Sequence, residues 1–250
     1  MNTLDSRCGA VDADMLARRN TRLLLGALAQ MTGFTLIIGP LALNQVREAI
    51  RRMGAKRGNA ARLHSYYDIW LERATSARVA RIVTGEELSD HQHRNPIHRW
   101  VEYTWEALQG DEDDVEHVCV ALACGAGVVL TGNMTCIDSD RLATAAAEAD
   151  LNVPLVLKRD RCIEHFRQIS GQGATLAMIE SAVLPNTLGD PDMRGMMQRL
   201  AHSLRHSFPA LRRELLANLR THEEYVSIGE SMPPHTMTRE IVAEMWELSM

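Results

Sequence analysis

The stretch from Asp111 to Asn133 reads DEDDVEHVCVALACGAGVVLTGN. It opens with acidic residues, continues through small residues from Val118 to Ala123, and turns at Gly125. The apolar run Val128–Leu130 then leads into the polar residues Thr131-Gly132-Asn133. A short apolar run after a glycine turn predicts a buried parallel strand, and small residues let the preceding helix lie close to it. The polar end of such a strand is where α/β proteins place their ligands.

The composition is that of an ordinary globular protein. The chain has 250 residues, of which 46% are hydrophobic and 24% charged, so it is long enough for one large domain or two small ones. The net charge of −5 gives no overall basic field to attract nucleic acid. Any contact with nucleic acid must therefore use a local basic patch.

Cysteines and apolar runs predict the compartment. The five cysteines are an odd number and contain no CxxC pair, which favours a reducing, cytoplasmic setting. The N-terminus lacks a basic-then-apolar signal pattern, and no apolar run approaches the ~18 residues that span a bilayer. We therefore expect neither export nor membrane contact.

Strand and helix patterns alternate in residues 10–57 and 114–169, which predicts an α/β fold. We expect a parallel sheet between two helical layers, a three-layer α/β/α arrangement. Its predicted strands are Phe34–Ile38, Val128–Thr131 and Pro154–Leu157.

The remaining segments surround this domain. We assign residues 1–170 to the α/β domain, with a helical insertion at 58–110, and residues 171–250 to a helical extension. Residues 1–10 are expected to be frayed. The segment HQHRNPIH contains His91, His93 and His98, but its spacing fits no standard zinc-ligand set, so we expect a polar loop.

Polar residues follow several predicted strands. In a parallel sheet the carboxyl ends of the strands lie at one edge, so acids distant in sequence can converge there. Converging carboxylates repel each other, and a divalent cation relieves that repulsion. The candidates are Asp12, Asp14, Asp114, Asn133, Asp138 and Asp140.

These residues resemble those of the PIN domain family, metal-dependent ribonucleases common in toxin–antitoxin systems and RNA processing. The strongest match is DVEHVCVALACGAGVVLTGN, which has an Asp opening a helix of small residues, a glycine turn, an apolar strand and Thr-x-Asn. Val11–Leu16 resembles the first PIN motif, in which Asp12 would be the first metal carboxylate. The resemblance covers about residues 1–57 and 111–169.

The resemblance implies a metal-activated water that cleaves single-stranded RNA, with Mg²⁺ or Mn²⁺ as the cofactor. It implies catalytic roles for Asp12, Asp114, Asn133 and Asp138. It also implies metal binding by Asp12, Asp114, Asp138 and Asp140. RNA would be the substrate. An antitoxin or another protein could bind through the helical regions, and the chain could also form a homo-oligomer. Asp12→Asn is expected to leave the fold intact, because removing one of several neighbouring carboxylates relieves their mutual repulsion.

Two positions depart from the family pattern. Gln45 stands where PIN domains carry a Glu, although Glu48 lies one turn further, and Cys136 stands where a fourth acid often occurs. The alternative is therefore a catalytically weakened PIN-like module that binds RNA or a protein partner.

A basic strip lies near these positions. Arg47, Arg51 and Arg52 lie on the predicted helix after the second strand. They can contact RNA phosphates, although such stripes are more often solvated surface.

Overall fold

A computed structural model describes residues 4–56, 58–108, 111–132, 139–169 and 208–213. These residues form two compact units. The first comprises residues 1–18 and 33–158, and the second comprises residues 19–32 and 159–250. The boundary predicted at residue 170 falls at the edge of a segment that is not described.

The first unit contains a parallel sheet of five strands in the order β3-β2-β1-β4-β5. Its strands are β1 (Asp5–Val11), β2 (Thr35–Ile38), β3 (Ala80–Ile82), β4 (Ala126–Thr131) and β5 (Leu155–Lys158). Parallel registers such as Ala10 with Ile37 and Leu130 with Leu157 link neighbouring strands. The predicted α/β class and the three predicted parallel strands are confirmed.

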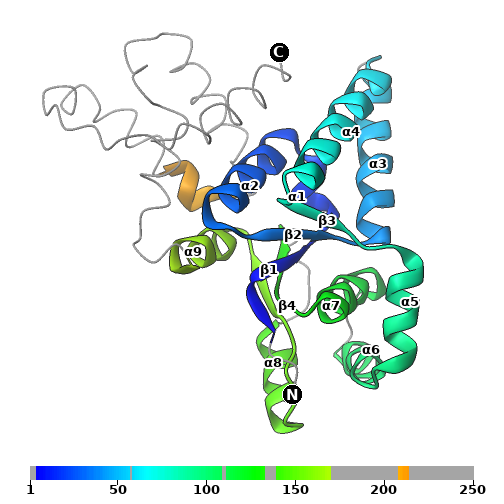
Figure 1. The fold of residues 1–250 in the computed structure, drawn as a ribbon, viewed down its shortest axis with the longest axis vertical. Helices are drawn as coiled ribbons and strands as arrows, with labels where there is room; N and C mark the ends of the chain where they lie inside the picture. The colour runs from blue at the N-terminus through cyan, green and yellow to red at the C-terminus, as the bar shows by residue number, and fades with distance from the viewer. Residues whose placement is uncertain (1–3, 57, 109–110, 133–138, 170–207, 214–250) are drawn as a thin grey trace, which may run out of the picture. The chain divides into compact units, whose positions relative to one another are not determined.

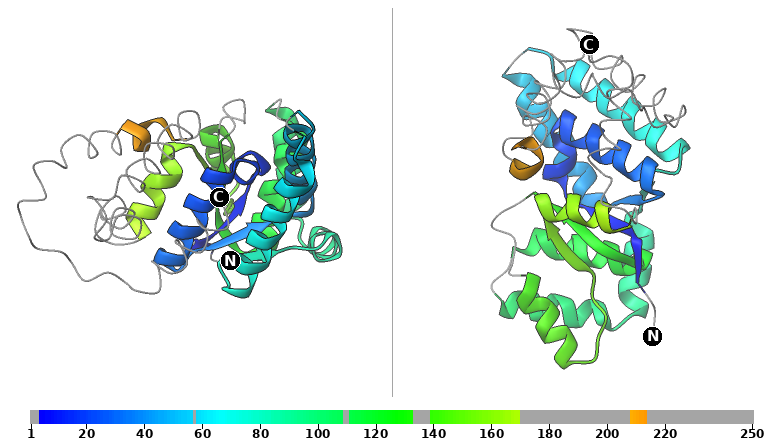
Figure 2. Two further views of the ribbon diagram at one scale, coloured as in Figure 1. Left: turned by 90° about the horizontal axis from the view of Figure 1, so that it is seen from above. Right: turned by 90° about the vertical axis from the view of Figure 1, so that its left-hand side faces the viewer.

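Helices cover both faces of this sheet. The first layer consists of α1 (Ala13–Ala17), α3 (Pro40–Ala55) and α4 (Ala60–Ser76). The second consists of α5 (Gly85–Arg94), α6 (Ile97–Ala107), α7 (Glu112–Cys124) and α8 (Ser139–Glu148). Figure 1 shows the two layers on opposite sides of the strands. The right-hand view of Figure 2 shows α4 (cyan) and α8 (green) on opposite sides of the sheet.

The core between the sheet and the second layer is built mainly from aliphatic and small residues. Val118, Cys119, Val120 and Ala121 of α7 are all buried there. Gly125 ends α7 with a φ of 66°, a left-handed conformation that suits glycine, and β4 follows immediately. The small residues thus bring α7 close to the sheet, as the sequence predicted.

The structure differs from the prediction in the central strand, in one edge strand and in one loop. Residues 1–10 were expected to be frayed, but Asp5–Val11 form the central strand β1. The segment expected to be a helical insertion contributes the edge strand β3. The polar segment that begins at Gly85 is the helix α5, which starts with a capping box between Thr84 and Glu87.

The second unit contains α2 (Arg19–Thr32) and α9 (Asp160–Ile169), which contact each other. The carboxylate of Asp160 accepts hydrogen bonds from the backbone N–H groups of Ala210 and Leu211. This anchors the short helical segment that begins after Phe208, a fully buried residue. The predicted helices of residues 171–250 otherwise lie outside the described residues.

Candidate metal centre

The strand order reverses direction between β1 and β4. The chain passes from β1 outward to β2 and β3, and then returns to add β4 and β5 on the other side. At such a point the connections that follow two adjacent strands run to opposite faces of the sheet. The crevice between these connections is where α/β proteins bind ligands. Asp12 follows β1 directly, and Thr131 is the last residue of β4.

Helix α7 brings two more side chains to the same edge. Because α7 leads back to the start of β4, its first turn lies at the carboxyl edge of the sheet. Asp114 lies in that first turn, and His117 lies one turn further on. Residues three apart share one helical face, so both side chains point in the same direction.

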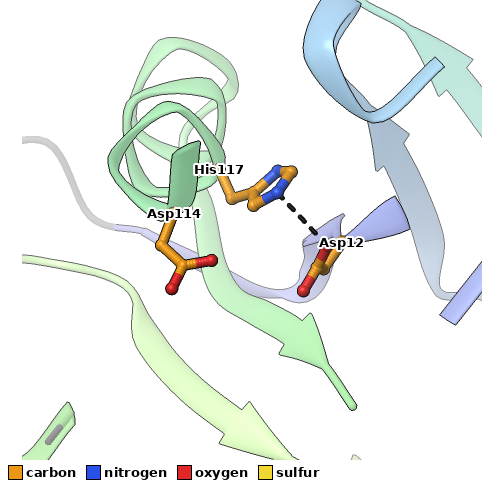
Figure 3. A group of neighbouring side chains, drawn as sticks. All are labelled: Asp12, Asp114 and His117. Atoms are coloured by element: carbon orange, nitrogen blue, oxygen red, sulfur yellow. Dashed lines mark ion pairs between the residues drawn. The ribbon is translucent and has the colours of Figure 1, made fainter. Parts of the chain in front are cut away.

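Asp12, Asp114 and His117 form a buried group of potential metal ligands. One ligand atom from each residue lies within 4.8 Å of the other two. The three residues expose only 6%, 7% and 4% of their surfaces, respectively. Figure 3 shows Asp114 and His117 side by side on α7, with His117 directed at Asp12. The predicted proximity of Asp12 and Asp114 is confirmed.

Both carboxylate oxygens of Asp12 are engaged. Oδ1 lies 3.3 Å from Nε2 of His117. Oδ2 accepts a hydrogen bond of 2.6 Å from the hydroxyl of Thr131. Asp12 occupies the N-cap position of α1, but its side chain makes no capping hydrogen bond. The two oxygens of this carboxylate are therefore held by His117 and Thr131.

Electrostatics couple Asp12 to His117. Burial alone would raise the pKa of Asp12, but the hydrogen bond and positive charge of His117 outweigh it and lower that pKa. Burial would likewise lower the pKa of His117, but the hydrogen bond and negative charge of Asp12 raise it above the usual value. Both shifts favour the charged forms, so the two residues form a buried ion pair when the imidazole of His117 is protonated.

Asp14 adds a further carboxylate beside this pair. The residue is exposed, but Oδ1 of its carboxylate accepts a hydrogen bond of 3.1 Å from the backbone N–H of Gly132. Neighbouring atoms nevertheless shield the carboxyl group from water, and this desolvation, followed by the negative charge of Asp12, raises the pKa of Asp14 to about 6. Repulsion between neighbouring carboxylates is what a bound cation would relieve.

Of the remaining predicted acids, Asp140 lies among the described residues and is not part of this group. Asn133, Cys136 and Asp138 lie outside the described residues. Asp140 is exposed in the first turn of α8. Within the described ranges, the group of potential metal ligands consists of Asp12, Asp114 and His117 only.

The residues on α3 have other partners. Gln45 donates a hydrogen bond of 3.1 Å to Asp113, the neighbour of Asp114 on α7. Glu48 is bound by Arg51 at 2.8 Å and by Arg52 at 3.5 Å. An acid held by two guanidinium groups is poorly placed to serve as a metal ligand.

The basic strip is exposed on the same helix. Arg47 forms an ion pair of 3.7 Å with Asp68 of α4. Arg51 and Arg52 share the single acid Glu48, so these three residues together keep a positive charge. Exposed pairs of this kind are weak and exchange readily for other anions.

The histidines after residue 90 lie on helices, so the expected polar loop is wrong. Nδ1 of His91 on α5 lies 2.6 Å from Nε2 of His98 on α6. In the described part of the chain no third potential ligand joins this pair. It links two helices and does not form a metal centre.

His117 is the member of the group that was not predicted from the sequence. Its position three residues after Asp114 was the available signal, because that spacing places both on one helical face. Thr131 was part of the quoted match, but its role in holding Asp12 emerges only from the structure.

Comparison with known proteins gives no match to any family model, curated protein or solved structure. Of the helices in the described segments, none is long and apolar enough to cross a membrane.

The donor atoms fit a divalent ion. An ion about 2.1 Å from each ligand requires its donors to lie within about 4.2 Å of one another. The ligand atoms of the group lie within 4.8 Å of one another, so a small movement of the side chains toward each other would bring them into range of one ion. Two carboxylates and one imidazole are common metal donors, so the group could hold a metal ion.

Proposed function

We propose that this protein is a metal-dependent ribonuclease that hydrolyses phosphodiester bonds of single-stranded RNA. The observation that carries the proposal is the buried group of Asp12, Asp114 and His117 at the reversal point of the sheet. The PIN-like pattern around Asp114 supports RNA as the substrate class.

Each residue of the group has a distinct task. A bound divalent ion would supply an activated water and neutralise charge on the phosphate. Asp12 and Asp114 would hold that ion with their carboxylates, and His117 would add a nitrogen ligand. Thr131 fixes the orientation of Asp12 through its hydroxyl.

Asp14 is suited to proton transfer beside this site. In the metal-free protein its pKa is raised to about 6. A bound cation would lower that pKa, so the carboxylate would be ionised at neutral pH and able to accept a proton. Its exposed position keeps it within reach of solvent. Asp14 would therefore accept a proton from the attacking water.

The basic strip on α3 is the proposed RNA contact. Arg47, Arg51 and Arg52 are exposed, and RNA phosphates can displace the weak ion pairs that they form. Because the net charge of the chain is −5, such a local patch must provide the attraction. Salt should therefore weaken RNA binding.

The test is cleavage of single-stranded RNA in Mn²⁺ or Mg²⁺ by the parent and two variants. Asp114→Asn should lower the rate at least about 100-fold, since even residues that merely support metal ligands contribute about 10- to 100-fold. Asp113→Asn is the matched control, because it removes the same charge from the same helical turn outside the group. Equal rates for the parent and Asp114→Asn would reject the proposal.

The second candidate is a catalytically weakened module that binds RNA or a protein partner. One observation favours it: Nε2 of His117 lies 3.3 Å from Asp12, so a protonated His117 neutralises this carboxylate without a metal. RNA binding by the parent that depends on Arg47, Arg51 and Arg52, without cleavage in any metal, would support this candidate. Loss of both binding and cleavage on replacing the arginines would instead favour the nuclease.

A further inference from the structure

We propose that the group of Asp12, Asp114 and His117 selects Mn²⁺, Co²⁺ or Zn²⁺ over Mg²⁺. This inference rests on the metal site of the proposed function. It restricts the proposed cofactor to divalent ions that accept nitrogen as well as oxygen ligands, and it excludes ions that bind oxygen almost exclusively.

The donor set is the first reason. Mg²⁺ and Ca²⁺ favour carboxylate, carbonyl and water oxygens, whereas imidazole suits Zn²⁺ and the later transition ions. Mn²⁺ shares the preference of Mg²⁺ for carboxylate oxygens, but it is also the first and weakest member of the first-row series of ions that bind mixed nitrogen and oxygen sites. With His117 among the donors, one position of the site favours the second class of ions.

The arrangement of Asp12 is the second reason. Thr131 binds Oδ2, and Oδ1 is the atom that faces Nε2 of His117. An ion between Asp12 and His117 would thus receive one oxygen and one nitrogen. Ca²⁺ needs six to eight oxygen ligands, often from bidentate carboxylates, and this arrangement does not supply them.

Burial is the third reason. Mg²⁺ gives up water reluctantly and usually keeps several water ligands. Each residue of the group exposes less than a tenth of its surface, with 7% for Asp114 as the largest value. A site so enclosed favours an ion that tolerates few waters and a low coordination number, as Zn²⁺ does.

The test uses the full chain and the metal chlorides alone. Thermal melts would be recorded in Mg²⁺, Mn²⁺, Co²⁺ and Zn²⁺, because an ion that binds only the folded state raises the melting temperature. We expect a rise in Mn²⁺, Co²⁺ and Zn²⁺ at concentrations where Mg²⁺ gives none. Electron paramagnetic resonance of free Mn²⁺ should show that a tenfold excess of Mg²⁺ leaves most of the bound Mn²⁺ in place.

A pair of variants assigns the selectivity to His117. His117→Gln replaces the nitrogen donor with an amide oxygen, so the preference for Mn²⁺ over Mg²⁺ should fall at least tenfold. His93→Gln is the matched control, because His93 is an exposed histidine on α5. If His117→Gln fails to fold, the competition between Mn²⁺ and Mg²⁺ on the parent still decides.

The outcomes separate this inference from the proposed function. Equal stabilisation by Mg²⁺ and Mn²⁺, or an unchanged preference in folded His117→Gln, would overturn the selectivity whether or not RNA is cleaved. Selective binding that His117→Gln abolishes would support it even if the parent cleaves no RNA.

Discussion

Replacing Asp12 with Asn should destabilise the metal-free protein. Crowding of acids alone would favour the opposite result, since one negative charge beside Asp14 and Asp114 is removed. The ion pair with His117 reverses that expectation, because the imidazolium loses its buried partner.

The magnitude follows from the burial of the pair. Breaking a buried ion pair by removing one partner costs about 3–5 kcal/mol. His117 can release its proton in the variant, which limits the cost to the lower end, about 3 kcal/mol. For a chain of this size that loss lowers the melting temperature by about 6–12 °C.

The loss of stability in Asp12→Asn should change with pH in a direction that the two pKa shifts predict. The pKa of His117 is raised on folding, so its contribution is complete below the unfolded value of about 6.5 and is lost as pH rises through the raised value. The pKa of Asp12 is lowered, so its contribution is present above about 3.9 and is lost as pH falls through the lowered value. The cost of Asp12→Asn should therefore be largest between about pH 4 and 6.5 and shrink at alkaline pH.

The assay is thermal and urea unfolding of the parent and Asp12→Asn in chelator at pH 6 and pH 9.5. Asp113→Asn serves as the control, because its carboxylate is exposed. A melting temperature of Asp12→Asn equal to or above that of the parent at pH 6 would refute the reasoning. So would a loss that is equally large at both pH values.

Three further changes test other parts of the structure. Asp14→Asn should stabilise the metal-free protein above pH 6, where the raised pKa of Asp14 makes its ionised carboxylate unfavourable, but not at pH 4. Because the residue is exposed, the gain in the free energy of unfolding in urea should stay below about 1 kcal/mol. Gly54→Ala should lower the melting temperature strongly, because the new Cβ would lie 2.3 Å from the backbone Cα of Ala60. Thr84→Ala should cost about 1 kcal/mol in urea unfolding by removing the capping box with Glu87, whereas Thr84→Ser should not.

The sequence predicted the buried strands of the sheet and missed the strands that lack an apolar run. β2 and β4 contain consecutive buried aliphatic residues, so the pattern identified them. β1 begins with three exposed residues, and only its last three are buried. β3 has three residues, of which Arg81 and Ile82 are exposed, so its pairing with β2 depends on tertiary contacts. Segments this short carry too little periodicity to be recognised.

The helix α5 was missed for a different reason. Its sequence, GEELSDHQHR, offers Leu88 as the only buried residue, so it has no apolar stripe. The capping box of Thr84 and Glu87 was nevertheless readable, since Thr followed three positions later by Glu marks a helix start.

The composition of the metal group follows from the directions of two helices. α3 begins at the carboxyl edge just after β2, so each further residue lies about 1.5 Å farther along its axis. Glu48 comes eight residues after Pro40, about 12 Å along that axis, and there it meets arginines. α7 also begins at this edge, so only side chains in its first turns, such as Asp114 and His117, can reach Asp12. The next residue back from His117, Glu116, faces α3 instead and accepts a hydrogen bond of 2.8 Å from the N–H of Leu41. The acid that the resemblance led us to expect on α3 is therefore not supplied by α3. In the described residues the third potential metal ligand is instead an imidazole from α7.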